Sequence, residues 1–149
     1  MHELKSPVTG DEWEKYHGIR RVSLFEERGR GEVYNDKHPD DKKEGNYPFV
    51  FLHDGKIIGS IRIDILNRRD AATRLVSIKK SERGKGHGTE MLRQAEAFIK
   101  EKDRTRVVVN AAPEAVEFYR RKGYSEEIWD AEELKQPGAQ DCIQMTKKI

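Results

Sequence analysis

Seven residues indicate the fold of this chain, Arg83-Gly84-Lys85-Gly86-His87-Gly88-Thr89, because of the segments on either side of them. The preceding residues, Arg74-Leu75-Val76-Ser77-Ile78, are mostly apolar or β-branched, which is typical of a strand. From Thr89 to about Lys102, apolar residues recur at helical spacing. A glycine-rich turn between a strand and a helix lets the backbone approach a phosphate, and the helix N-terminus adds partial positive charge. The stretch therefore predicts a pyrophosphate-binding loop, to which Arg83 and Lys85 add full charges.

Three kinds of phosphate-binding loop have this plan, and the spacing of the glycines separates them. A P-loop needs Gly-x-x-x-x-Gly-Lys-Ser/Thr, and no Gly-Lys here is followed by Ser or Thr in that register. A dinucleotide-binding fold needs Gly-x-Gly-x-x-Gly near its start, whereas this loop lies mid-chain and its glycines alternate. The pattern that fits is Arg-x-x-Gly-x-Gly, at Arg83, Gly86 and Gly88. It resembles the coenzyme A loop of the GNAT superfamily of N-acetyltransferases.

A second segment resembles the other GNAT signature, which is Ala-x-x-Phe-Tyr followed by three residues, Gly and an aromatic. It reads Ala115-Val116-Glu117-Phe118-Tyr119-Arg120-Arg121-Lys122-Gly123-Tyr124. The residues predict a short helix: Pro113 suits a first turn, Glu114 complements the helix dipole, and Gly123 suits the position after the end. Together the two signatures indicate coenzyme A binding.

Length and composition agree with a single globular domain over residues 1–149. Charged residues make up 38% of the chain and the mean hydropathy is −0.92, so the surface is strongly solvated. The apolar residues nevertheless cluster in periodic segments, which argues against disorder. With 29 basic and 27 acidic residues the net charge is only +2, and we expect no nucleic-acid partner.

Cysteine, histidine and hydropathy patterns add further expectations. Cys142 is the only cysteine, so the chain has neither an internal disulfide nor a thiolate zinc cluster. The histidines show no metal-ligand spacing, and we expect no metal; they are His2, His17, His38, His53 and His87. No apolar run approaches a membrane span and the N-terminus lacks a signal-peptide core. These features favour a cytoplasmic protein without a membrane partner.

The order of predicted elements runs from a capped helix through a hairpin to a closing antiparallel pair. Thr9 and Glu12 form a capping box for a helix from about Gly10 to Arg28, which Gly29 to Gly31 would stop. A polar segment to about Tyr47 is a long loop or carries a short helix. The predicted strands are Phe49–Leu52, Ile57–Leu66, the strand ending at Ile78, Arg106–Asn110, Glu126–Trp129 and Cys142–Lys147.

Two details of these strands are specific. Asp54-Gly55 is a strong turn signal for a hairpin. In the returning strand, Ile61, Ile63 and Ile65 should face one side, and Ser60, Arg62 and Asp64 the other. Because a helix crosses between them, the strand at 106–110 should lie parallel to the strand ending at Ile78.

The fold expected is therefore a single α/β domain of the GNAT type. The resemblance, which covers nearly the whole chain, implies a mixed, mostly antiparallel sheet with a splayed central parallel strand pair, flanked by helices. We expect the pair to diverge where Val76 to Ile78 faces Val108 to Asn110.

The resemblance also implies roles for individual residues. Val76, Ser77 and Ile78 would lend backbone groups to the pantetheine arm of the co-substrate acetyl-CoA. The amides of Gly84, Lys85, Gly86, His87, Gly88 and Thr89 would bind its pyrophosphate, with Arg83 at the basic position of the signature. Tyr119 would be the general acid that protonates the departing thiolate. An acceptor amine would attack the thioester directly, and a backbone N–H near Ile78 would stabilise the oxyanion.

Two positions depart from the family pattern. The family often has Asn seven residues before this tyrosine, where this chain has Ala112. Asn110 lies two residues earlier, and the sequence leaves open whether it takes the place of the family Asn. Some relatives place a general-base Glu at the position of Val107. Other candidates for the base are Asp64 and His53, or a water relay. His87 has an imidazole of suitable pKa, but its place in the loop should point it toward phosphate or solvent.

The function expected is acetyl transfer to an amine, and two other classes remain as alternatives. One is a non-catalytic acyl-CoA-binding or regulatory module, and a more distant one is a nucleotide-phosphate binder. The presence of Tyr119 favours the enzyme, because cofactor binding alone does not need a phenol beside the sulfur. The acceptor could be a small amine, an amino acid, an antibiotic or a protein amine, and the sequence does not indicate the oligomeric state.

Overall fold

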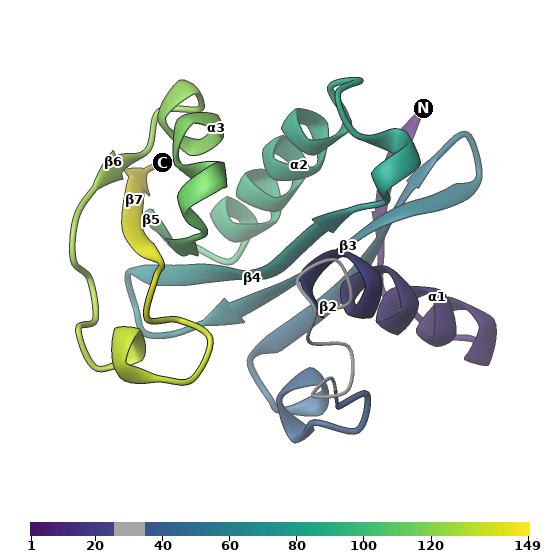
Figure 1. Ribbon diagram of the computed structural model, residues 1–149, viewed down its shortest axis with the longest axis horizontal. Coiled ribbons are helices and arrows are strands. Elements are labelled where there is room, and N and C mark those ends of the chain that lie inside the picture. Colours follow the sequence, from purple (N-terminus) through teal and green to yellow (C-terminus); the bar gives the residue numbers. More distant parts are fainter. Residues whose placement is uncertain (26–34) are drawn as a thin grey trace.

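The computed structural model describes residues 1–25 and 35–149, and its strands form one sheet in the order β1-β2-β3-β4-β5-β7-β6 (Figure 1). The strands are β1 His2–Lys5, β2 Asn46–His53, β3 Lys56–Ile65, β4 Asp70–Ile78, β5 Arg106–Ala111, β6 Ser125–Glu126 and β7 Ile143–Lys148. Neighbouring strands are antiparallel except β4 and β5, which are parallel. This arrangement confirms the predicted mixed, mostly antiparallel sheet of an α/β domain.

Helices cover both faces of the sheet, with α1 on one face and α2 and α3 on the other (Figure 1). The α-helices are α1 Gly10–Arg20, α2 His87–Glu101 and α3 Val116–Arg121. Shorter helical turns are η1 Arg21–Phe25, η4 Pro39–Lys42, η5 Lys80–Glu82, η6 Pro113–Ala115 and η7 Glu133–Lys135. Among the described residues, no helix combines the length and the apolarity needed to cross a membrane.

The two faces of β3 differ as predicted. Ile61 and Ile63 are fully buried in the hydrophobic core that α2 and α3 share with the sheet. Arg62 and Asp64 lie on the opposite face, where Arg62 approaches Asp41 of η4. This polar face is also buried, since Arg62 and Asp64 are 7% and 5% exposed. Because buried charges are stable only when paired, the α1 face of the sheet is built from ion pairs as well as apolar contacts.

The first helix begins as predicted. Thr9 accepts the N–H of Glu12 and the Glu12 side chain accepts that of Thr9, which completes the capping box. The α-helix ends at Arg20 and continues as the π-helical turn η1 to Phe25. The rest of the predicted helix and its stop at Gly29 to Gly31 lie outside the described residues. The following polar segment carries a short helix, η4, which was one of the two alternatives.

The β2–β3 hairpin has the predicted turn, but both ends of the sheet differ from prediction. Asp54 and Gly55 both have positive φ, +50° and +82°, as a type I′ turn requires. The strand β1 was not predicted; it pairs with β2 at the edge. At the other edge, β6 is Ser125–Glu126, so of the predicted strand Glu126–Trp129 it contains only Glu126. The N–H of Glu127 still donates to the Gln144 carbonyl, whereas that of Trp129 donates to the Gln144 side chain, at 2.8 Å.

The central parallel pair is splayed. β4 and β5 pair only at Asp70–Arg106, Ala71–Val107 and Ala72–Val108. Beyond these residues β4 pairs with β3 and β5 pairs with β7, so the facing edges carry no mutual pairing. Arg106 donates two hydrogen bonds to Asp70, at 2.8 and 2.9 Å, and thereby fastens the closed end. The predicted divergence is confirmed, and it opens the sheet at its centre.

Candidate functional site

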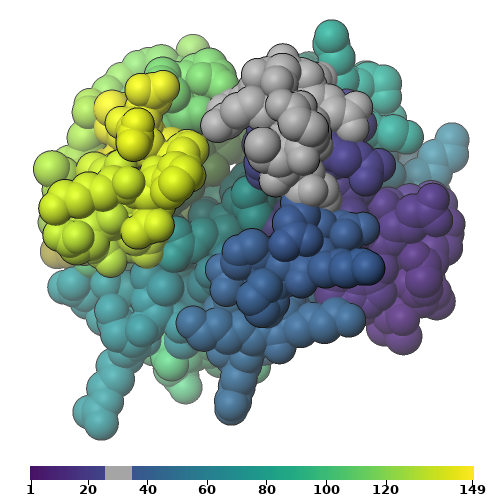
Figure 2. All heavy atoms as spheres, turned by 60° about the horizontal axis from the view of Figure 1, so that its bottom comes forward, coloured from purple at the N-terminus to yellow at the C-terminus, as the bar shows by residue number. Residues whose placement is uncertain are grey.

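A cavity of about 840 Å³ occupies the place where β4 and β5 separate. Three of the predicted site residues line it: Val76 from β4, Asn110 from β5 and Tyr119 from α3. Arg62, on the α1 face of β3, lines it too, so the cavity reaches from one face of the sheet to the other. Figure 2 shows this side of the molecule hollowed between the yellow C-terminal residues and the blue residues around η4 and β2.

A bulge in β4 shapes one wall of the cavity. Ser60 pairs with Ser77 and Arg62 with Arg74, so two residues of β4, Leu75 and Val76, face a single residue of β3. Leu75 has a φ of +51°, which is uncommon for a branched side chain. Bulges are common next to active sites, where they redirect a side chain or end the strand pairing. Since Leu75 and Val76 both line the cavity, the bulge presents irregular backbone toward its interior.

Tyr119 lies at the α3 side of the cavity and is 4% exposed. Its ring packs edge-on against Phe118 and Tyr124, with centroids 5.3 and 5.2 Å away. Burial raises the pKa of the Tyr119 phenol, and a weaker influence from the Thr73 hydroxyl lowers it. The phenol is therefore protonated at neutral pH and is a proton donor that faces the cavity.

Asn110, which lies two residues before the position of the family Asn, already hydrogen-bonds to neighbouring side chains. Its amide nitrogen donates to Glu133 at 3.0 Å and its oxygen accepts from Gln144 at 3.0 Å. Glu133 in turn pairs with Arg74 through both carboxylate oxygens. Burial is the largest single influence and acts to raise the pKa of Glu133, but the hydrogen bonds from Arg74 and Asn110 and the charge of Arg74 together outweigh it, and the pKa is lowered. Asn110 thus belongs to a polar network along the cavity. Ala112, at the position of the family Asn, also lines the cavity.

Neither residue suggested as general base lies in this cavity lining. Both oxygens of Asp64 accept from Arg62, at 2.7 and 2.8 Å, and one also accepts from Arg74. His53 lies at the far end of β2 and stacks on His2, with ring centroids 4.5 Å apart. The lining instead contains His38 and Glu114, neither of which was a predicted site residue.

The predicted phosphate loop lies beyond the end of β4 and leads into α2. Gly84 and Gly86 have φ of +78° and +86°, and a Cβ built on either would meet no atom within 4 Å. Gly86 is the N-cap of α2 and offers no side-chain acceptor to the N–H groups of the first turn. Those groups are therefore available to an anion, as the prediction requires.

The basic side chains of the loop interact with other protein groups. Arg83 donates to the Ile78 carbonyl at 2.8 Å and to the Ser23 hydroxyl at 2.9 Å, so it ties the loop to β4 and η1. Lys85 pairs with Glu82 at 3.1 Å and is largely exposed. Arg83 thus braces the loop, while Lys85 keeps its charge at the surface beside it.

The expectation that His87 points toward phosphate or solvent is wrong for its side chain, which is 7% exposed. Its Nδ1 lies 2.9 Å from Nε2 of His2, and its ring centroid lies 4.5 Å from that of His53. The pKa of His2 is lowered by burial and then by the two neighbouring imidazoles. The first turn of α2 therefore presents its backbone to the loop and its histidine to the sheet.

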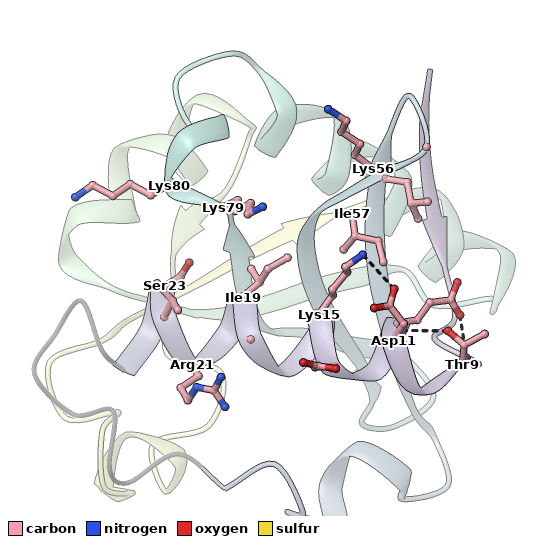
Figure 3. A pocket seen from close by; sticks show the side chains of 16 residues that line it. Thr9, Asp11, Lys15, Ile19, Arg21, Ser23, Lys56, Ile57, Lys79 and Lys80 are labelled. Atoms are coloured by element: carbon pink, nitrogen blue, oxygen red, sulfur yellow. Dashed lines mark hydrogen bonds and ion pairs between the residues drawn. The ribbon is translucent and has the colours of Figure 1, made fainter.

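A second cavity, of about 810 Å³, lies between α1 and the β2–β3 hairpin (Figure 3). It contains both basic and acidic side chains, among them Lys15, Lys79 and Asp11. Lys15 and Asp11 pair with each other at 3.1 Å. None of the predicted site residues lines this groove, so the cavity at the splayed strands is the better candidate for chemistry.

Several solved structures share this fold, and some of them are described as acetyltransferases. The PaiA N-acetyltransferase from Thermoplasma acidophilum, in complex with coenzyme A, has a TM-score of 0.72 at 15% identity and covers 100% of this chain and 99% of its own. Escherichia coli ElaA has a TM-score of 0.76 at 17% identity, with 99% of each chain covered. An acetyltransferase of the GNAT family from Staphylococcus aureus has a TM-score of 0.75 at 15% identity, with the same coverage.

At these identities the structural matches establish the fold alone. A search of curated protein sequences found no match. The family model described as acetyltransferase (GNAT) domain matches residues 25–147, which is most of the chain. That match spans both sequence signatures, the phosphate loop and the segment around Tyr119, and the structure has the corresponding fold. The chain belongs to the GNAT family of acetyltransferases.

Proposed function

We propose that the chain is an acetyl-CoA-dependent N-acetyltransferase that transfers an acetyl group to an amine by direct attack on the thioester. One observation carries the proposal: a buried, protonated tyrosine faces a cavity between the unpaired edges of two parallel strands. Such an arrangement can hold an extended arm between the strands and place its end beside a proton donor. Membership of the GNAT family supports this assignment.

Binding of acetyl-CoA would use the loop and the open edge of β4. The N–H groups of Gly84 to Thr89 would bind the pyrophosphate, because Gly84 and Gly86 leave space beside the backbone. The edge of β4 from Val76 to Ile78 would pair with the amides of pantetheine in the manner of an added strand. The acetyl group would then lie in the cavity near the bulge at Leu75 and Val76.

In the reaction the amine nitrogen bonds to the carbonyl carbon and the carbon–sulfur bond breaks. The irregular backbone at Leu75 and Val76 would donate to the developing oxyanion, slightly upstream of the position expected near Ile78. Tyr119 would give its proton to the departing sulfur. The attacking amine must lose a proton, and we assign its removal to Glu114, directly or through water.

Glu114 is preferred over His38 as the base because a hydrogen bond already occupies the acceptor nitrogen of the His38 ring. Nδ1 of His38 accepts the Asp40 N–H at 3.2 Å, which leaves Nε2 as the protonated nitrogen of the neutral ring. A ring in that form donates and does not accept at its outer nitrogen. The Glu114 carboxylate lines the cavity from η6, on the same side as α3.

The experiment measures thiol release from acetyl-CoA with a panel of small amines, amino acids and peptides. With an acceptor in hand, Tyr119→Phe should lower kcat by about 10²–10⁴ and leave coenzyme A affinity nearly unchanged. Tyr124→Phe is the matched control, because Tyr124 is also buried but donates to Glu96 and is absent from the cavity lining. Equal rates in parent and Tyr119→Phe would show that Tyr119 only packs.

Two other outcomes separate the alternative functions. If coenzyme A binds but no amine supports thiol release, the chain is better described as a non-catalytic acyl-CoA-binding module. If ADP and NAD raise the melting temperature as much as acetyl-CoA does at equal concentration, it is a nucleotide-phosphate binder.

A further inference from the structure

Three histidines that are far apart in the sequence meet at one edge of the sheet. His2 lies on β1 and is paired in register with His53 at the end of β2, so their side chains project from the same face. His87 is the first residue of α2 and reaches the same place from above the sheet. The three imidazoles therefore come from three separate elements.

The nitrogens of this cluster lie at distances suited to a shared ion. One nitrogen from each ring lies within 4.8 Å of the other two, and Nε2 of His2 lies 2.9 Å from Nδ1 of His87. A tetrahedral zinc site has Zn–N distances of about 2.0–2.1 Å, which separates its ligand nitrogens by about 3.3–3.4 Å. The observed 2.9 Å lies just below that value and the upper limit of 4.8 Å lies above it, so the rings must rotate to place all three nitrogens around one ion.

Acidic groups lie beside the cluster, and an ion has a way in. Asp54 has a carboxylate oxygen 3.6 Å from Nε2 of His53, and the carboxylates of Glu82 and Glu90 interact electrostatically with the cluster. Each of these carboxylates also pairs with a cation, Asp54 with the N-terminal amine, Glu82 with Lys85 and Glu90 with Arg93, so the site depends on the imidazole ligands themselves. His87 is buried, whereas His53 is about one-third exposed and Asp54 lies at the surface. An ion could therefore enter past the hairpin turn and reach a buried ligand.

We propose that His2, His53 and His87 form a binding site for a divalent transition metal ion, with water or a neighbouring carboxylate at the remaining position. Imidazole ligands without thiolates suit zinc, copper, nickel and cobalt, and do not suit magnesium or calcium. The ion would join β1, the β2–β3 hairpin and the first turn of α2. Its place is distinct from the cavity around Tyr119, so the site stands whether or not the acetyl-transfer proposal holds.

Nuclear magnetic resonance on the unmodified chain tests the site directly. Zn²⁺ is added while the ring signals of all five histidines are followed. The signals of His2, His53 and His87 should change together and saturate at one ion per chain, while those of His17 and His38 should not change. Absence of any saturable change, or changes only at His17 or His38, would overturn the proposal.

Calorimetry with variants gives a second, quantitative test. His53→Gln should weaken Zn²⁺ binding by at least about tenfold, because loss of even an outer-shell partner commonly costs that much. His38→Gln is the matched control, since His38 lies outside the cluster and is more than half exposed. Circular dichroism confirms that both variants are folded. Equal Zn²⁺ affinity in the parent and in His53→Gln would also overturn the proposal.

Discussion

Replacing Gly86 by alanine tests whether the glycine loop binds the pyrophosphate. Gly86 has a φ of +86°, so an L-residue there is strained by about 1–2 kcal/mol. The added methyl group meets no protein atom within 4 Å, so it creates no clash within the fold. For a chain of this size the strain should lower the melting temperature by roughly 2–8 °C.

The effect on coenzyme A should be larger than this strain explains. A methyl group in the space beside the loop would push the phosphate away from the N–H groups of the first turn of α2. We expect coenzyme A affinity to fall by at least about tenfold, which corresponds to about 1.4 kcal/mol of binding free energy. The assay is isothermal titration calorimetry at a temperature where the variant is fully folded.

Gly55→Ala is the matched control for this substitution. Gly55 also has a positive φ, +82°, and a Cβ there also meets no atom within 4 Å, but it lies in the hairpin turn after β2. The two variants should lose similar stability, and only Gly86→Ala should lose coenzyme A affinity. If both bind coenzyme A as tightly as the parent, the pyrophosphate is not held at Gly86 and our assignment of the loop fails.

Three further predictions concern the base and the buried charges. Glu114→Gln should lower kcat more than His38→Gln does, measured by thiol release, and the reverse order would transfer the role of base to His38. Asp41→Ala should lower the free energy of unfolding by about 3–5 kcal/mol in urea titrations, because it removes the carboxylate that Tyr16, Arg20 and Arg62 share; a loss below about 1 kcal/mol would contradict this. Burial acts to raise the pKa of Asp70, but several hydrogen bonds, of which that from Arg106 is the strongest, lower it overall. The Asp70 carboxylate therefore stabilises the fold at pH values above its unfolded pKa of about 3.9, and this stabilisation is lost as the pH falls below that value. Asp70→Asn should therefore be less stable than the parent at pH 7 and lose less additional stability between about pH 5 and pH 2; parallel stability curves would refute this.

Much of the fold could be predicted from local sequence. The helix after the glycine loop has strong 3.6-residue periodicity. A helix is the usual crossover between two neighbouring parallel strands, and β4 and β5 follow this pattern. The turn at Asp54 and Gly55 needs positive φ, which Asn, Asp and Gly tolerate best. These features depend on a few neighbouring residues, and for that reason the sequence reveals them.

Features that depend on distant pairing could not be predicted. The strand β1 has only four residues, without clear alternation, and it forms because β2 offers an edge. The meeting of His2 with His87 follows from that pairing, across 85 positions of sequence. The bulge at Leu75 is likewise decided by register with β3.

The candidate site was predictable in part. The family resemblance implied roles for Val76 and Tyr119, which the structure places in one cavity, and the assignment of those roles remains a prediction. The positions of His38 and Glu114 depend on how η4 and η6 pack, which no local pattern reports. The orientation of Arg83 toward Ser23 is a tertiary contact of the same kind.

The short parallel pairing of β4 with β5 divides the sheet into two leaves that share a narrow hinge. One leaf is β1 to β4 and the other is β5, β7 and β6. Among the described residues, the strands of the two leaves pair with each other only from Asp70 to Ala72 on β4 and from Arg106 to Val108 on β5. Directly before them, the Arg69 carbonyl accepts the N–H groups of Thr105 and Arg106. Amides that face the gap beyond the hinge should exchange with deuterium faster than those inside either leaf. A ligand arm that pairs with the edge of β4 and packs against β5 would bridge the leaves and slow that exchange. The two leaves should therefore move as one rigid sheet only while a ligand occupies the gap.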